Sequence, residues 1–571
     1  MIENLPPRWD MEADLVAIGS GGGGLAAAIT GHDHGISALV LERADQVGGV
    51  TALSMGEVWI PGNHLAAEAG IADSAESGFR YVQTLSMGYG NDAAILNQSL
   101  HGPVALRWFE EQIGLKMAVI HGCPDYYFRH NNDAISEGRY LEVVPFPAET
   151  LGEWQSRTRV SAQVPYAFTH EDIFKGGGTA NMVQWDYGLM AERLGKDERC
   201  LGPGLAAYFV KGALDRGIPL ETGVEVVELI GDGHRVVGVR ARRDGQDLFV
   251  RAHRGVVIAV SSYERNPELA KTLSNQIDPV SMVMPSVDGA HLRMAGQVGA
   301  RIARVPDPTN LGIHIPGEEL EDGVPLWRGS LPFLGLPHTI VVNRAGQRFA
   351  DESFYRALYY AVDVIDGASQ THPNFPCWVV FDAQARAKYP FGSVPPGADL
   401  PEGLAVSADT LEELALRIGV DPGGLAETVA RFNRDCEGGE DTLFARGTYP
   451  WASVMIGDIH QKPNANLGPL REGPYYAVEL KRMGGGGIAG TGLVADHHCR
   501  AVDWNGDVID GLYVAGNSMV RFDNGAVMQS GMTNARGMTH GYLAGRHAAG
   551  NPSDLFERVI SGETPAEAQP A

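Results

Sequence analysis

A glycine-rich turn near the start of the chain has the residue types that hold a diphosphate. The spacing GxGxxG occurs within Gly19-Ser20-Gly21-Gly22-Gly23-Gly24, between the apolar run 14–18 and the small-residue stretch 25–31. Glycines let such a turn close tightly, bring backbone N–H groups to a pyrophosphate and let the next helix pack on a sheet. Glu42 ends the following apolar run and can accept hydrogen bonds from ribose hydroxyls. This order predicts a dinucleotide site, and a glycine-rich surface turn is the alternative.

A second glycine pair follows the acidic residue. Arg43 comes directly after Glu42, and Gly48-Gly49 stand just before Thr51. A glycine pair in this place resembles the arrangement through which flavoproteins reach a long, folded-back FAD. The resemblance therefore implies FAD rather than NAD as the cofactor.

Further motifs, in order along nearly the whole chain, resemble the fumarate reductase and 3-ketosteroid dehydrogenase flavoprotein superfamily. They are Gly49–Gly56 with Trp59-Ile60-Pro61, Gly202–Leu205, Val341–Glu352, Lys462-Pro463-Asn464, Gly473–Ala477 and Gly511–Asn517. Several ordered motifs are more specific than one glycine turn. The resemblance implies an FAD-dependent oxidoreductase that acts on CH–CH groups.

Three tyrosines favour the ketosteroid dehydrogenase branch. Tyr126 lies in Cys123-Pro124-Asp125-Tyr126-Tyr127, which resembles that branch's Pro-Asp-Tyr. Tyr355 comes three residues after Glu352, and Tyr476 lies in Gly-Pro-Tyr-Tyr-Ala, which resembles Gly-Pro-Phe-Tyr-Ala. The resemblance implies Tyr126, Tyr355 and Tyr476 as catalytic candidates.

The dicarboxylate reductase branch matches less well. That branch has a histidine beside Thr-Met-Gly-Gly and an arginine-bearing carboxylate clamp near its end, whereas this chain has Lys481-Arg482-Met483-Gly484-Gly485 without a histidine. Arg386 sits where a reductase-type arginine would stand, but we expect it to be a solvated helix residue. A fumarate reductase-type ene-reductase remains one alternative, and a flavin-binding protein without turnover is another.

The resemblance also assigns residues to the cofactor. The implied FAD-binding residues are Gly19, Ser20, Gly21, Gly22, Gly24, Glu42, Arg43, Gly49, Thr51, Ser54, Gly56, Val226, Ala259, Gly516, Asn517, Gly525, Met528, Gln529 and Ser530.

The implied reaction places a C=C bond next to the carbonyl of a cyclic ketone, either a 3-ketosteroid or a cyclohexanone-like ring. It removes a proton from the α carbon and a hydride from the β carbon, and the flavin takes the hydride at N5. A tyrosine, with an ordinary pKa of about 10, is a poor base unless its neighbours assist it. We assign the base role to Tyr355 with Tyr126 as its hydrogen-bond partner, and enolate stabilisation to Tyr476 with a nearby N–H. Packing is the alternative role of each tyrosine.

The elements that must position these residues suggest an α/β fold. The FAD-binding domain is predicted to be discontinuous, over 1–279 and 481–571, with an aromatic-rich insertion at about 70–200; an α+β substrate domain covers 280–480. Predicted strands are 224–230, 235–240, 248–251, 256–260 and 511–517, and predicted helices are 93–112, 408–418, 424–436 and 531–549. Arg348, Asp351 and Glu352 are expected to form an ion-paired turn beneath the site, and a proton path is the alternative.

Composition limits the other possibilities. The 571 residues exceed one hydrophobic core, and a net charge of −25 argues against nucleic-acid binding. Five scattered cysteines form no CxxC pair, and no export signal or membrane span is evident, so a reduced, cytoplasmic protein is expected. The pairs His32/His34 and His497/His498 are expected to be surface residues rather than metal ligands, so no metal is predicted. The electron acceptor, the oligomeric state and the particular ketone stay open.

Overall fold

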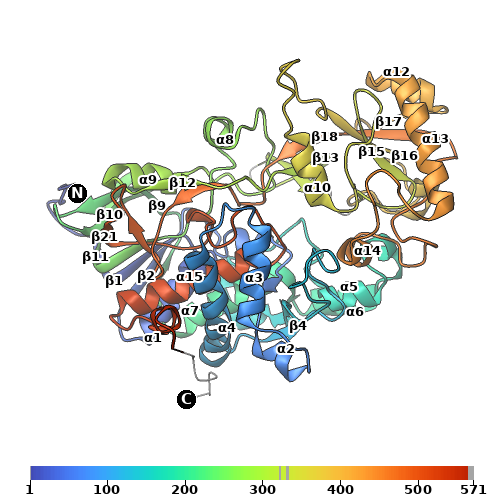
Figure 1. Ribbon diagram of the computed structural model, residues 1–571. Coiled ribbons are helices and arrows are strands. Elements are labelled where there is room, and N and C mark those ends of the chain that lie inside the picture. Colours follow the sequence, from blue (N-terminus) through green and yellow to red (C-terminus); the bar gives the residue numbers. More distant parts are fainter. Residues whose placement is uncertain (1, 321–322, 330–332, 564–571) are drawn as a thin grey trace.

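The computed structural model describes residues 2–320, 323–329 and 333–563. Two lobes lie side by side (Figure 1): one holds β1 and the helices α1 and α15, and the other holds β13, β15, β16 and β18. The chain leaves the first lobe once and returns to it near its end, which is the discontinuous α/β arrangement that the sequence predicts.

The first lobe is organised around a largely parallel sheet. In the described part of the chain this sheet has eight strands in the order β20-β21-β11-β1-β2-β8, and β10 and β9 extend it from β11. The strands are β1 (Met11–Ile18), β2 (Ala38–Leu41), β8 (Leu220–Glu221), β9 (Glu225–Gly231), β10 (Val236–Arg243), β11 (Gln246–Ile258), β20 (Arg500–Val502) and β21 (Val508–Val514). β1, β2, β11 and β21 run parallel, so their carboxyl ends meet at one edge. Open α/β sheets bind ligands at such an edge.

One strand differs from its prediction. The expected strands 248–251 and 256–260 are a single strand, β11, which pairs antiparallel with β10 at its start and parallel with β21 at its end. His253 and Arg254 are exposed, which made the sequence resemble a break between two strands. β1 pairs alongside β11 from Met11 to Ile18 and absorbs one register shift.

Helices with small residues cover the sheet closely. α1 (Gly22–Asp33) packs against α15 (Met532–Ala548), where a Cβ on Gly541 would lie 2.5 Å from the Gly23 carbonyl oxygen. The same core includes Phe109 of α4 (Asp92–Ile113) and Phe209 of α7 (Leu201–Asp215). The aromatic-rich insertion therefore packs onto the first lobe through α4, whereas its Tyr126 and Tyr140 belong to a core shared with the second lobe. The predicted helices 93–112 and 531–549 correspond to α4 and α15.

The second lobe holds an antiparallel sheet with helices beside it. Its described strands follow the order β14-β13-β18-β16-β15, and β17 pairs with β18. They are β13 (Asn310–Glu319), β14 (Pro325–Gly329), β15 (Thr339–Asn343), β16 (Cys377–Phe381), β17 (Val406–Ala408) and β18 (Tyr475–Met483). Its helices are α10 (Tyr355–Val362), α11 (Ala383–Lys388), α12 (Leu411–Ile418), α13 (Pro422–Gly438) and α14 (Pro450–Met455). The predicted helices 408–418 and 424–436 correspond to α12 and α13.

Packing refines the proposed domain boundary. Met294 and Ala295 of α9 (Ala290–Val298) are part of a core shared with the first sheet, and β12 (Ile302–Arg304) pairs with β19 (Thr491–Leu493). The second sheet begins only at Asn310, later than the expected boundary at 280.

The remaining described α-helices and strands are α2 (His64–Glu68), α3 (Ala75–Leu85), α5 (His170–Lys175), α6 (Tyr187–Gly195), α8 (Pro267–Ser274), α16 (Leu555–Ile560), β3 (Val58–Trp59), β4 (Met117–Val119), β5 (Tyr140–Val143), β6 (Phe146–Pro147) and β7 (Glu198–Arg199).

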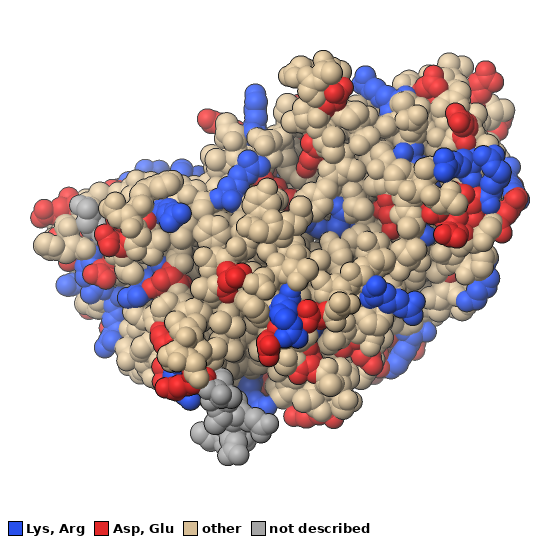
Figure 2. Space-filling view, viewed as in Figure 1, with Lys and Arg blue, Asp and Glu red and all other residues tan. Residues whose placement is uncertain are grey.

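Acidic and basic side chains are interspersed on the face shown in Figure 2. Among the described residues, no helix combines the length and apolar character needed to cross a bilayer. All five cysteines are buried and unpaired.

Candidate active site

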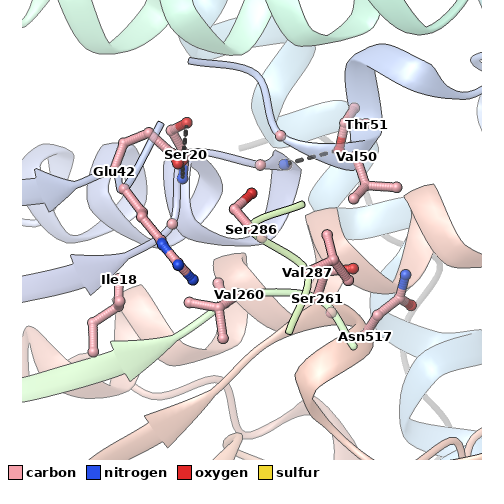
Figure 3. A pocket seen from close by; sticks show the side chains of 18 of the residues that line it. Ile18, Ser20, Glu42, Val50, Thr51, Val260, Ser261, Ser286, Val287 and Asn517 are labelled. Carbon is pink, nitrogen blue, oxygen red and sulfur yellow. Dashed lines mark hydrogen bonds between the residues drawn. The ribbon is translucent and has the colours of Figure 1, made fainter. Parts of the chain in front are cut away.

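A cavity opens where the parallel strands of the first sheet end (Figure 3). It contains about 1140 Å³ of space between protein atoms, part of which is open to solvent. The predicted cofactor residues that line it are Gly19, Ser20, Gly21, Gly22, Glu42, Arg43, Gly49, Thr51, Ser54, Val226, Ala259, Gly516 and Asn517. Residues far apart in the sequence thus meet at one site.

Three glycines in the cavity wall or directly behind it leave no room for a side chain. Gly19 has φ +95°, and a Cβ there would lie 2.5 Å from the Ala259 carbonyl oxygen. A Cβ on Gly24 would lie 2.0 Å from the Gly19 oxygen, and one on Gly49 would lie 2.9 Å from Gly21 Cα. The two glycine segments therefore form a backbone cradle at the start of α1. This cradle fits the pyrophosphate of FAD.

Glu42 binds the glycine-rich turn through Ser20. Its Oε2 accepts hydrogen bonds from the Ser20 backbone N at 2.9 Å and from Ser20 Oγ at 2.6 Å (Figure 3). The Gly22 N–H donates to Thr51 Oγ1 at 3.0 Å. Carboxylate oxygens accept more than one hydrogen bond each, so Glu42 retains capacity for ribose hydroxyls.

Six predicted cofactor residues do not line this cavity. Gly24 lies behind the turn, and a Cβ on Gly56 would lie 2.2 Å from the Leu201 backbone carbon. A Cβ on Gly525 would lie 2.5 Å from the Gly90 nitrogen. Gly56 and Gly525 therefore allow neighbouring backbone segments to pack closely. The other three are Met528, which is half-buried, and Gln529 and Ser530, which contact the Tyr126 segment.

Two of the three predicted catalytic tyrosines are in direct contact. Tyr355 donates a hydrogen bond from its hydroxyl to the Tyr126 hydroxyl at 2.8 Å, and Tyr126 donates to Ser530 Oγ at 2.8 Å. Trp451 lies against both rings, with centroids 4.1 Å from Tyr126 and 5.6 Å from Tyr355. Burial raises the pKa of both phenols above their usual value.

A buried ion pair fixes the position of Tyr126. Asp125 accepts from Arg139 Nη1 at 2.8 Å and from Trp59 Nε1 at 2.7 Å. Gln529 accepts from the Tyr126 backbone N–H at 3.2 Å. In the Pro-Asp-Tyr motif the aspartate is therefore the anchor, and the tyrosine points into the aromatic cluster.

A second ion-paired network precedes Tyr355. Arg348 pairs with Glu352 at 2.7 Å and with Asp441 at 2.8 Å, and all three side chains are buried. The expected ion-paired turn is confirmed for Arg348 and Glu352. Asp351 instead accepts from the Ser353 backbone and hydroxyl.

The third tyrosine lies apart from this pair. Tyr476, on β18, is half-buried and stacks on Phe381 with centroids 5.2 Å apart. Among its described contacts there is no hydrogen bond to Tyr126 or Tyr355. Nearby Arg386 was expected to be solvated, but it is only 7% exposed and donates to the carbonyls of Tyr389 and Pro395. That expectation was wrong, because the segment after α11 folds back over the guanidinium.

The tyrosine pair and the cavity are joined through α15. Ser530 comes three residues before Thr533, and Thr533 and Asn534 of the first turn of α15 line the cavity. Three residues of chain span at most about 11 Å. Ser530, which accepts the hydrogen bond from Tyr126, therefore lies close to the cavity wall.

Sequence reasoning missed a carboxylate that holds the tetraglycine loop after β18. Glu264 is buried and accepts from the Gly487 N–H at 2.6 Å and the Ile488 N–H at 3.0 Å. Gly486, in the same loop, lines the cavity. Burial raises the pKa of Glu264 to about 7, although these N–H groups act in the opposite direction. The run of glycines was visible in the sequence, but its distant acceptor was not.

A buried histidine belongs to a charged cluster that contacts one residue of the cavity wall. His170 lies 3.0 Å from Glu57 and 3.2 Å from Glu142. Burial alone would lower its pKa, but the two carboxylates raise that pKa to about 10. The Glu57 backbone oxygen accepts from Asn534 Nδ2 at 2.9 Å, so this cluster contacts a residue of the cavity wall.

Comparison with known proteins agrees with an FAD site at this backbone cradle. The FAD binding domain family matches residues 14–533. The 4-oxocyclohexanecarboxylate 2-dehydrogenase of Sinomonas cyclohexanicum is 33% identical over 549 residues, which cover 94% of this chain and 93% of that protein. The 3-oxosteroid 1-dehydrogenase of Mycobacterium tuberculosis (strain ATCC 25618 / H37Rv) is 29% identical over 94% of this chain and 98% of that protein.

Solved structures show the same fold. The 3-ketosteroid delta1-dehydrogenase of Sterolibacterium denitrificans, in complex with 1,4-androstadiene-3,17-dione, superposes with a TM-score of 0.85 at 29% identity, over 94% of this chain and 99% of that one. A flavocytochrome c3 fumarate reductase shares the fold, with a TM-score of 0.61 at 19% identity, over 95% of this chain and 79% of that one. The chain belongs to the FAD binding domain family, and it is a flavin-dependent oxidoreductase that uses FAD.

Proposed function

We propose that the protein desaturates a cyclic ketone next to its carbonyl, with a 3-ketosteroid or a smaller cyclohexanone-like ring as substrate. The hydrogen-bonded pair Tyr355 and Tyr126 carries this proposal, because it supplies a proton acceptor beside the segment that leads into the cofactor cavity. The relatives named above act on rings of both kinds. When bound, FAD supplies the acceptor for the hydride removed from the β carbon.

Tyr355 receives the α proton through a relay rather than as a standing phenolate. Its raised pKa makes a persistent anion unfavourable. The hydrogen bonds run from Tyr355 to Tyr126 and from Tyr126 to Ser530 Oγ. As the α proton reaches the Tyr355 oxygen, the Tyr355 proton passes to Tyr126 and the Tyr126 proton passes to Ser530 Oγ, and the partly exposed Ser530 releases its own hydroxyl proton to solvent. Each phenol remains neutral at the end of the transfer.

Tyr476 is proposed to stabilise the enolate oxygen that forms as the α proton leaves. Its stacking on Phe381 holds the ring in one orientation, and its half-buried position leaves the phenol accessible to a ligand. A donor aimed at developing charge lowers the barrier more than it strengthens substrate binding. Replacement of Tyr476 by Phe should therefore lower kcat more than it raises KM.

An anaerobic panel tests the proposal. The holoenzyme, with its FAD oxidised, is mixed with saturated steroid ketones and with monocyclic ketones, and the flavin absorbance is followed. At least one class should bleach the flavin. Bleaching by neither class, combined with reoxidation of the dithionite-reduced enzyme by fumarate, would favour an ene-reductase instead. No response to any ketone or to fumarate would favour a flavin-binding protein without turnover.

A further inference from the structure

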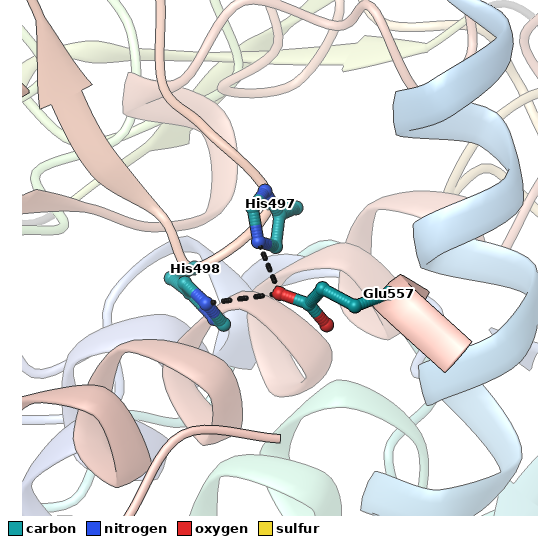
Figure 4. A group of neighbouring side chains, drawn as sticks. All are labelled: His497, His498 and Glu557. Carbon is teal, nitrogen blue, oxygen red and sulfur yellow. Dashed lines mark hydrogen bonds and ion pairs between the residues drawn. The ribbon is translucent and has the colours of Figure 1, made fainter. Parts of the chain in front are cut away.

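Two adjacent histidines and a glutamate converge where the last described helix meets the body of the protein (Figure 4). His497 Nε2 lies 2.6 Å and His498 Nε2 lies 3.3 Å from the same oxygen, Oε1, of Glu557 in α16. The three ligand atoms lie within 4.8 Å of one another. The side chains of His497 and Glu557 are partly exposed, so an ion from solvent can reach them.

The donor set suits a borderline transition metal. Imidazole nitrogens and carboxylate oxygens bind Zn²⁺ at about 2.0–2.2 Å, and a tetrahedral ion holds neighbouring ligand atoms about 3.4 Å apart. The His498–Glu557 separation already has this value, and His497 needs only a small side-chain rotation to reach it. Water can fill the position that protein ligands leave open.

One further observation points to a ligand at this place. Glu557 Oε2 is shielded from solvent and has no hydrogen-bond partner among the described residues. Buried oxygens are normally satisfied, and a cation held by both carboxylate oxygens would supply this atom with a partner.

We propose that His497, His498 and Glu557 form a site for a divalent transition-metal ion of the Zn²⁺ class, which fastens α16 to the segment before β20. The site joins parts of the chain that already contact one another, because the His497 ring stacks on Phe556 of α16 with centroids 5.1 Å apart. An ion bound there stabilises the folded protein in proportion to its concentration. The sequence predicted no metal because Glu557 lies far along the chain from the histidine pair.

Metal binding to the chelator-treated holoenzyme tests this site. Calorimetric titration with ZnCl₂ should give one ion per chain and a Tm that rises with zinc, while MgCl₂ should give neither. Glu557→Gln and His498→Gln should weaken zinc binding by about tenfold or more. His253→Gln is the matched control, because His253 pairs with Glu12 at 3.3 Å without a second histidine ligand. It should bind zinc as the unchanged protein does.

The unchanged protein also reports on the site directly. Co²⁺ added in place of Zn²⁺ should give the visible absorption bands of a low-coordinate nitrogen and oxygen site, and Zn²⁺ should remove them. The proposal fails if the three variants and the unchanged protein bind zinc equally, or if zinc leaves the Tm unchanged and Co²⁺ gives no such bands. The cluster would then be an ordinary histidine–glutamate ion pair.

Discussion

Tyr355 is the residue at which proton removal can be separated from cofactor binding. Tyr355→Phe removes the first hydroxyl of the relay but leaves the FAD cavity unchanged. FAD content should stay normal, and the rate of flavin bleaching by a ketone should fall by about 10²–10⁴-fold, the usual contribution of a general base. Stopped-flow absorbance under anaerobic conditions measures this rate.

Tyr140 offers a matched control for that variant. Tyr140 lies in the same aromatic cluster, 6.4 Å from the Tyr126 ring, and its buried hydroxyl has no hydrogen-bond partner among the described residues. Tyr140→Phe should bleach at the normal rate. If Tyr355→Phe also bleaches normally, Tyr355 has no part in the reaction.

At this scale, local motifs predicted some residues and not others. The sequence could indicate Tyr126 and Tyr355 because each follows an acidic residue in a recognisable motif, Asp125 and Glu352. It could not indicate that Gln529 supports Tyr126, or that Arg386 is buried, because both depend on segments that meet only after folding.

The first element to test is the turn into α1. In Gly24→Ala the new Cβ would lie 2.0 Å from the Gly19 carbonyl oxygen, so the turn must shift and the cradle must open. Overpacking of this kind costs about 1–3 kcal/mol, and FAD affinity should fall with it. Flavin fluorescence on release and thermal unfolding measure the two effects.

Gly195 at the end of α6 is the comparison. A Cβ there meets nothing within 4 Å, so Gly195→Ala should leave FAD affinity and Tm close to normal. Equal FAD affinity in Gly24→Ala and Gly195→Ala would mean that the turn does not hold the cofactor.

The tetraglycine loop gives a prediction about pH. The pKa of Glu264 in the folded protein is about 7, above its ordinary value of 4.5. The folded protein therefore holds this proton more tightly, so the stabilisation is complete below pH 4.5 and is lost as the pH rises through 7. Between pH 5 and pH 8 the unchanged protein should lose up to about 3 kcal/mol more stability than Glu264→Gln. Tm measured across this range gives the comparison.

Glu268→Gln, an exposed change on α8, is the control for that series and should follow the unchanged protein. Parallel Tm profiles for Glu264→Gln and the unchanged protein would show that Glu264 does not titrate in this range.

Sequence patterns predicted the strand 256–260 near this loop, but they did not predict that it continues from 248–251 as the single strand β11. A strand that changes from antiparallel to parallel partners has no local signal at the point of change.

The whole molecule is held together at the FAD cavity by segments from distant parts of the chain. β1, α15 and the segments directly after β11 and β21 all contribute to its wall. Ligand that binds only the folded state stabilises it by about 2.7 kcal/mol at 100 times its Kd. The Tm of apoprotein should therefore rise steadily with added FAD, and an unchanged Tm would contradict the cavity as the cofactor site. Riboflavin, which lacks the diphosphate, should raise it much less.

Overall architecture was predictable because the β1–α1–β2 unit and the motifs along the chain are local patterns. The boundary between the two domains was harder to predict, because α9 packs on the first sheet although it lies beyond residue 280. No local pattern shows which core a short amphipathic helix will join.

The reaction itself is tested most directly with deuterated substrate. A saturated cyclic ketone, labelled with deuterium at the α carbon or at the β carbon, is mixed with oxidised holoenzyme under anaerobic conditions. The proposed mechanism predicts loss of the oxidised-flavin absorbance and a primary isotope effect on at least one of the two labels. The unlabelled ketone should give a product two mass units lighter than itself, with the new double bond beside the carbonyl. Oxidised flavin that stays unbleached by every steroid and monocyclic ketone would contradict this mechanism.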